Sequence, residues 1–209
     1  MTLEKFFATD FAGKNSGDTL PKLLAQGCPG GHVLSIANSL VLNLVATDWF
    51  QKTQYQLIVV DKNEDHLNEI RKLGKLAIKS DSVDAFTTRI EEKFGEVSAK
   101  GLEKRNLLTD EVMKGLRLIQ RMILIVEDLS SSTVVGKINA AKSEGPFSVL
   151  YLSNVEFYVG TALFGASAGS KGDYGKNIRS LISPGTRVFR GPSVVMTEHV
   201  GEVPANWCV

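Results

Sequence analysis

The chain has 209 residues, and its 24 Lys or Arg against 23 Asp or Glu give a net charge of +1 at pH 7. Hydrophobic residues make up 43% of the sequence, so this nearly neutral chain can bury a core and is unlike an intrinsically disordered protein. The even charge balance also argues against a nucleic-acid binder driven by a strong overall positive field.

The N-terminal residues 1–31 predict a short helical segment ahead of a single domain over residues 32–209. This segment has no apolar run of signal-peptide length, and nowhere does the sequence reach the roughly 18 apolar residues of a membrane span. The cysteines, Cys28 and Cys208, have no zinc-site spacing, and two unpaired thiols are typical of a reducing compartment. We therefore expect a cytoplasmic protein.

The domain begins with two strand–helix pairs. Residues 32–37 (HVLSIA) form a compact apolar run typical of a buried strand, and residues 38–52 follow with helical spacing. Residues 55–61 (YQLIVVD) predict the clearest strand, because four consecutive apolar residues indicate burial on both faces, as in a parallel sheet. The next helix, 63–73, has Asn63 as its cap, and Gly74 is expected to end it.

The alternation continues to the end of the chain. We expect a short strand at 75–81, a polar helix at 83–94 and a charged, partly helical connection at 95–118. A buried strand at 121–128, a helix at 130–145, another buried strand at 147–153 and a closing hairpin at 186–200 follow. This order predicts an α/β fold, a Rossmann-like doubly wound and mostly parallel sheet of about seven strands, the last of them antiparallel. Such sheets bind ligands beyond the carboxyl ends of their strands.

Asp61 closes the second predicted strand and is the first candidate site residue. In a sheet that binds a dinucleotide or an adenosyl group, a carboxylate here accepts hydrogen bonds from both ribose hydroxyls. The alternative is that Asp61 caps the helix that follows. Lys62 comes directly after it, at the same strand end, and is counted with it as a candidate cofactor-binding residue.

The turn after the first strand contains Ser35, Ala37 and Asn38 but no glycine. Small residues allow a ligand to approach closely, yet they do not supply the positive φ angles of a phosphate-binding loop. This composition disfavours a pyrophosphate and favours a ligand without phosphate, such as S-adenosylmethionine. We place Ser35, Ala37 and Asn38 at its binding site.

Two further acidic groups follow predicted strands. Asp81 and Ser82 stand at the end of the predicted strand 75–81, where an acid could accept a hydrogen bond from the adenine amino group. The alternative is that Asp81 or Ser82 caps the next helix. Glu127 and Asp128 end the strand 121–128, near the ligand's amino group or a substrate, and capping is again the alternative. The histidines have no metal-ligand spacing, so no metal site is expected.

One segment carries a resemblance to a known family. Residues 151–156 read YLSNVE, Tyr158 follows, and Asn177-Ile178-Arg179-Ser180 stands downstream. Together with the strand end at Asp61, this combination resembles a bacterial family related to class I S-adenosylmethionine-dependent methyltransferases. The resemblance implies a seven-stranded sheet with its last strand antiparallel and a cofactor pocket at Ser35–Ser39 and Asp61. It also implies a substrate-side role for five residues, Asn154, Glu156, Tyr158, Arg179 and Ser180.

We therefore expect a methyltransferase that uses S-adenosylmethionine, with a small-molecule or protein substrate that the sequence does not identify. Glu156 would act as general base or orient a substrate amine, and Arg179 would bind a carboxylate or phosphate. The alternative is that Glu156 and Arg179 pair with each other. Two other functions stay open, a nicotinamide-dependent enzyme and a Rossmann-like binding protein without catalytic activity.

Overall fold

The computed structural model describes residues 30–153, 170–190 and 197–200. Their contacts group the chain into two compact units, each with its own set of elements. The helical unit contains Ala37–Gln54 and Asn63–Met122. The sheet unit contains the described parts of Cys28–Ile36, Tyr55–Lys62 and Ile123–Val209.

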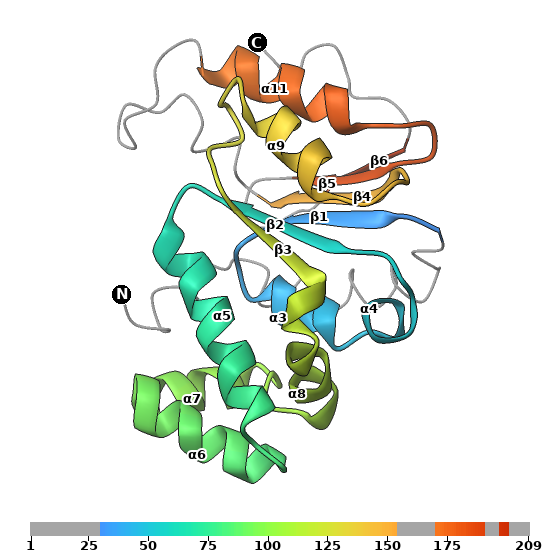
Figure 1. The fold of residues 1–209 in the computed structure, drawn as a ribbon. Helices are drawn as coiled ribbons and strands as arrows, with labels where there is room; N and C mark the ends of the chain where they lie inside the picture. Colours follow the sequence, from blue (N-terminus) through green and yellow to red (C-terminus); the bar gives the residue numbers. More distant parts are fainter. Residues whose placement is uncertain (1–29, 154–169, 191–196, 201–209) are drawn as a thin grey trace. The chain divides into compact units, whose positions relative to one another are not determined.

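The sheet unit is built on a six-stranded sheet of order β3-β2-β1-β4-β5-β6 (Figure 1). In chain order the strands are β1 His32–Ile36, β2 Leu57–Asp61, β3 Met122–Val126, β4 Phe147–Ser153, β5 Arg187–Arg190 and β6 Thr197–Val200. β1 pairs in parallel with both β2 and β4, β4 pairs in parallel with β5, and β6 is antiparallel to β5. The strand order therefore reverses between β1 and β4, which is the switch point of a doubly wound sheet.

Two helices cover one face of this sheet, α9 (Val134–Ala141) and α11 (Ser170–Leu181) (Figure 1). Alternate strand residues face them, because successive side chains of a strand point to opposite faces. The resulting core combines strand residues with helix residues: Leu34, Ile58, Val60, Leu150, Leu152 and Val188 from the strands, and Val134, Ile138, Tyr174, Ile178 and Leu181 from the helices.

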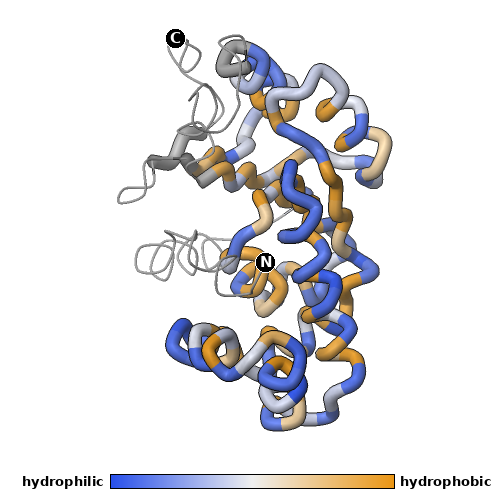
Figure 2. Tube along the Cα trace, turned by 90° about the vertical axis from the view of Figure 1, so that its left-hand side faces the viewer, coloured by the Kyte–Doolittle hydropathy of each residue, from blue (hydrophilic) through white to orange (hydrophobic). Residues whose placement is uncertain are grey.

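The helical unit contains six α-helices in its described part: α3 Leu40–Val45, α4 Asp48–Lys52, α5 Glu64–Ile78, α6 Val83–Phe94, α7 Glu96–Lys104 and α8 Asp110–Arg117. A 3₁₀ turn, Ile119–Arg121, leads from α8 into β3. Along the helices, hydrophilic and hydrophobic residues follow one another (Figure 2), as expected of helices that bury one side. None of the described helices combines the length and apolar character of a membrane span.

The strand expected at residues 75–81 is wrong, because α5 continues to Ile78. Ile70, Leu73 and Ala77 are buried at helical spacing, so Ala77 continues the buried face of α5, whereas Ile78 is 56% exposed. Gly74 does not end the helix. A Cβ at this position would lie 2.5 Å from Ile119 Cδ1, so the glycine allows the 3₁₀ turn to pack closely against α5.

Most other predicted elements are confirmed, with two changes. The helix expected at 38–52 is interrupted, and Thr47 caps α4 by accepting a hydrogen bond of 3.3 Å from the N–H of Phe50. The sequence predicts a buried strand at 121–128, but β3 lies at the edge of the sheet, and Val126 is 42% exposed. The turn of the expected closing hairpin, 191–196, lies outside the described residues, as does nearly all of the segment 1–31.

Candidate functional site at the carboxyl edge of the sheet

Asp61 is the last residue of β2, and it lies one residue beyond the final pair of β2 with β1, Val60 with Ile36. Its side chain is half-buried. Its carbonyl oxygen accepts a hydrogen bond of 3.0 Å from the N–H of Glu127, the first residue after β3. The ends of β2 and β3 therefore meet, and we call this part of the sheet unit, with the end of β1, the carboxyl edge. Lys62 follows and is exposed.

Ser35 lies within β1, paired with Val59 of β2 on one side and Tyr151 of β4 on the other. The residue is only 1% exposed. Its hydroxyl donates a hydrogen bond of 2.9 Å to the carbonyl oxygen of Ile36. The hydroxyl proton is therefore used locally, so this oxygen can serve further only as an acceptor.

The turn after β1 supplies hydrogen-bond acceptors for the first backbone amides of α3. Asn38 Oδ1 accepts a hydrogen bond of 3.0 Å from the N–H of Leu40, and the next two amides of α3 bond to the carbonyls of Asn38 and Ser39 at 3.1 and 3.0 Å. Ala37 and Asn38 are both buried, and no residue from 35 to 39 has a positive φ angle. The first amides of this helix are thus bonded within the turn and the helix itself.

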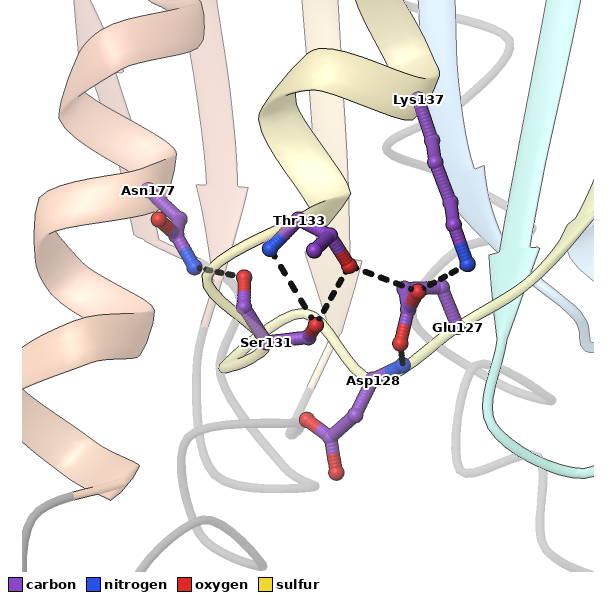
Figure 3. Close-up of polar contacts among 6 residues, drawn as sticks. All are labelled: Glu127, Asp128, Ser131, Thr133, Lys137 and Asn177. Atoms are coloured by element: carbon purple, nitrogen blue, oxygen red, sulfur yellow. Dashed lines mark hydrogen bonds and ion pairs between the residues drawn. The ribbon is translucent and has the colours of Figure 1, made fainter.

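Glu127 is held by three donors in the turn between β3 and α9 (Figure 3). Its Oε1 accepts a hydrogen bond of 3.2 Å from the N–H of Asp128, and its Oε2 accepts from the Thr133 hydroxyl at 3.1 Å and from the Lys137 ammonium. The hydrogen bond from Lys137 holds the pKa of Glu127 below its ordinary value, although partial burial acts in the opposite direction. Glu127 is therefore an ionised carboxylate with both oxygens occupied.

Asp128 uses only one of its carboxylate oxygens in the same turn. Its Oδ1 accepts hydrogen bonds from the N–H of Ser130 at 2.8 Å and from the Ser130 hydroxyl at 2.7 Å. No described residue donates to Oδ2, and the side chain points away from the network around Glu127 (Figure 3). Asp128 thus combines a fixed position with an oxygen that can accept from a ligand.

Asp81 and Ser82 do not follow a strand, because the segment before them is the end of α5. Both belong to the helical unit and are exposed, and Ser82 Oγ caps α6 by accepting a hydrogen bond of 3.2 Å from the N–H of Ala85. The reason for placing them in a cofactor site is therefore gone, and capping, the alternative, applies to Ser82. The strand end next to β2 belongs instead to Glu127 and Asp128.

The predicted catalytic residues Asn154, Glu156 and Tyr158 lie outside the described residues, so a pairing of Glu156 with Arg179 lies outside them as well. Arg179 is an exposed residue of α11. The Ser180 hydroxyl donates a hydrogen bond of 3.0 Å to the carbonyl of Lys176 in the same helix. In the described part of the chain, no three His, Cys, Asp or Glu side chains lie together as a metal site.

Asn177 is a residue to which the sequence pattern alone assigns no role of its own. It lies in α11, is 8% exposed, and its Nδ2 donates to the carbonyls of Leu129 at 2.9 Å and Ser131 at 2.8 Å. The burial of Asn177 could have been predicted from the helical spacing of its neighbours. Tyr174, Ile178 and Leu181 form a buried face of α11, and position 177 lies on that face. A polar residue on a buried face requires hydrogen-bond partners, which the sequence alone does not identify.

No protein-family model matches the chain, and no curated protein matches it. Solved structures similar to it include the rRNA methyltransferase aviRa from Streptomyces viridochromogenes, with 12% sequence identity and a TM-score of 0.47. The match covers 93% of this chain and 76% of that one. Identity and TM-score are both low, so a function has to follow from the residues of the carboxyl edge themselves.

Proposed function

We propose that the protein is a methyltransferase that binds S-adenosylmethionine along the carboxyl edge, with the adenosine across the ends of β1, β2 and β3. The observation that carries this proposal is the position of Asp61, at the end of the strand beside β1 in a doubly wound sheet. A carboxylate there has two acceptor oxygens for the two ribose hydroxyls, which are donors. In the sequence, Lys62 directly follows β2, Ser35 is the last residue but one of β1, and Ala37 and Asn38 come directly after that strand.

Asp128 is the better partner for the adenine amino group. Both Glu127 oxygens already accept hydrogen bonds, whereas Asp128 Oδ2 accepts none from the described residues. An exocyclic amino group is a donor and needs such an acceptor. The sequence pattern assigns this role to Asp81, and it moves to Asp128 because β3, not residues 75–81, is the strand beside β2.

The turn after β1 supports the proposed cofactor class. A nicotinamide dinucleotide needs backbone amides for its pyrophosphate, normally at a glycine-rich turn and helix N-terminus. Here the amides of Leu40, Val41 and Leu42 are satisfied within the turn. S-adenosylmethionine carries no phosphate and does not need them. The antiparallel β6 is in keeping with the antiparallel last strand that the resemblance implies, although the described sheet has six strands rather than seven.

The substrate would lie toward the end of β4, where Asn154, Glu156 and Tyr158 follow, together with Arg179. Methyl transfer requires chiefly that the nucleophile be held in line with the sulfonium methyl group. Glu156 would take the proton that the nucleophile loses, and Arg179 would hold a carboxylate or phosphate of a small-molecule or protein substrate. We place the reaction in the cytoplasm, in keeping with the two unpaired cysteines expected from the sequence.

Calorimetric titration with S-adenosylmethionine and S-adenosylhomocysteine tests the proposal. The wild-type chain is expected to bind both, and Asp61→Asn is expected to weaken binding by about 10- to 100-fold, the loss of charge-assisted hydrogen bonds to the ribose. Asp84→Asn is the matched control, because Asp84 is an exposed residue of α6 in the helical unit. A folded wild type that releases no heat at millimolar ligand would overturn the proposal. Equal affinities of the two variants would remove Asp61 from the site.

A further inference from the structure

Asn177 is a buried amide, and within the described part of the chain its side chain bonds to a single loop. Its Nδ2 uses both hydrogens on the turn between β3 and α9, at the carbonyls of Leu129 and Ser131 (2.9 and 2.8 Å). The bond to Ser131 is drawn in Figure 3. Asn177 comes from α11, 46 residues further along the chain than Ser131. This amide therefore links two elements of the sheet unit that are distant in sequence.

Apart from the N–H of Glu127, the other hydrogen bonds of residues 127–133 stay within the turn and the start of α9. The side chains of Asp128, Ser131 and Thr133 bond within the turn, and Glu127 bonds to Lys137 at the second turn of α9. Among the described residues, only two hydrogen-bonded connections reach other elements: the N–H of Glu127 to Asp61 in β2, and the pair from Asn177 in α11. The turn is thus fixed at its start and at its middle.

Asp128 lies between these two points of attachment. The residue before it is bonded to β2, and the residue after it is bonded to Asn177. We infer that Asn177 is a positioning residue, which holds the Asp128 carboxylate where it accepts from the adenine amino group. This inference rests on the proposed function. Asn177 itself need not contact the cofactor, since it acts through the backbone of the turn.

The side-chain chemistry at position 177 is restrictive. Only a donor with two hydrogens can serve both carbonyls, so Asn177→Ala leaves two carbonyls without this donor, and Asn177→Asp replaces the donor with oxygens that repel them. A matched control is available in Asn139→Ala, because Asn139 is an exposed residue of the neighbouring helix α9. Both alanine variants replace an asparagine in a helix of the sheet unit, but only one breaks the link.

A double-mutant cycle with S-adenosylhomocysteine tests the inference, with binding measured by calorimetry for the wild type, Asn177→Ala, Asp128→Ala and the double variant. Asn177→Ala is expected to weaken binding about tenfold, as for the loss of one positioned hydrogen bond, and Asn139→Ala is expected to leave it unchanged. In the Asp128→Ala background, Asn177→Ala is expected to have no further effect, because the two residues act on one contact. Fully additive losses would overturn the inference, since a general structural role lowers affinity in both backgrounds.

Hydrogen exchange of the free proteins separates this inference from the proposed function. Asn177→Ala is expected to speed amide exchange of residues 128–133 while the exchange of β4 stays slow, and the retained slow exchange also shows that the variant is folded. Unchanged exchange in the turn would overturn the link, whether or not the protein binds the ligand. A wild type that fails to bind overturns the proposed function, and with it the role of Asp128. Additive losses in a protein that binds overturn the role of Asn177 alone.

Discussion

Among single residues, Glu69 of α5 gives the most direct pH-dependent prediction. It is 2% exposed, and none of the described residues forms a hydrogen bond with its Oε2. Burial raises the pKa of Glu69 above its ordinary value of 4.5, and Lys72 only partly opposes this. Because the folded pKa is raised, the unfolded chain ionises first as the pH rises above 4.5, so the free energy of unfolding falls over that window. Glu69→Gln is therefore expected to stabilise the protein by about 1–3 kcal/mol at pH 7.

Urea unfolding at pH 4 and pH 7 measures this effect. The gain from Glu69→Gln is expected to be much smaller at pH 4, where the glutamic acid is mostly protonated in both states. Glu92→Gln, at an exposed position of α6, is the control and should change stability little at either pH. An equal gain at both pH values would contradict the explanation, because it would not depend on ionisation.

The candidate site shows which residues a sequence can reveal. Asp61 follows an apolar run that is unmistakable on its own, so its strand-end position could be predicted. The choice of Asp128 over Glu127 could not, because it depends on Lys137, which is one turn into the next helix and occupies Glu127. Asn177 depends on carbonyls in a turn far from it in sequence, and backbone partners of this kind leave no pattern in the residues.

At the scale of elements, two helical glycines allow helices to approach one another. A Cβ on Gly115 of α8 would clash with the carbonyl oxygen of Val45, at the end of α3. A Cβ on Gly74 would meet the side chain of Ile119, which can shift more easily than a backbone atom. Both alanine substitutions are expected to lower the free energy of unfolding by about 1–3 kcal/mol, with Gly115→Ala the more costly.

Two other helical glycines provide controls with the opposite sign. At Gly101 in α7 and Gly136 in α9, no described atom beyond the helix's own neighbouring backbone lies within 4 Å of the place that a Cβ would occupy, so alanine fits there without a clash. Gly101→Ala and Gly136→Ala are expected to raise stability by about 0.5–1 kcal/mol, because alanine has the higher helix propensity. Thermal and urea unfolding of the four variants would contradict this account if all four moved in the same direction.

Gly74 is also the place where the predicted secondary structure differs from the structure. A glycine after an amphipathic run normally indicates a helix end, and the apolar residues after Gly74 resemble a short strand. α5 nevertheless continues to Ile78, and Gly74 lies against Ile119, 45 positions further along the chain, a contact that local patterns do not contain. The strands 55–61 and 147–153 are predictable because polar or turn-forming residues precede and follow each short apolar run, and neither run has helical spacing.

At the scale of the whole molecule, alternation of strands and helices is enough to predict an α/β fold, but not which strands are neighbours. Between the end of β2 at Asp61 and the start of β3 at Met122 lie four consecutive α-helices, α5 to α8. An insertion of this length conceals the fact that β3 is the next strand of the sheet. Once β3 takes its place beside β2, Glu127 and Asp128 move to the end of the strand that adjoins Asp61.

This arrangement predicts how ligands change the stability of the entire chain. A ligand that binds only the folded state at 100 times its Kd raises the free energy of unfolding by about 2.7 kcal/mol. For a chain of 209 residues this corresponds to a rise in Tm of about 5–10 °C. S-adenosylhomocysteine is expected to produce such a shift, and Asp61→Asn to reduce it. NAD and NADP are expected to produce none, because the amides of Leu40, Val41 and Leu42 already have partners and cannot hold a pyrophosphate. Thermal melts over a series of ligand concentrations distinguish S-adenosylhomocysteine from NAD and NADP as ligands. A rise in Tm with NAD and none with S-adenosylhomocysteine would show that the turn after β1 opens to bind phosphate. The proposed cofactor class would then be wrong.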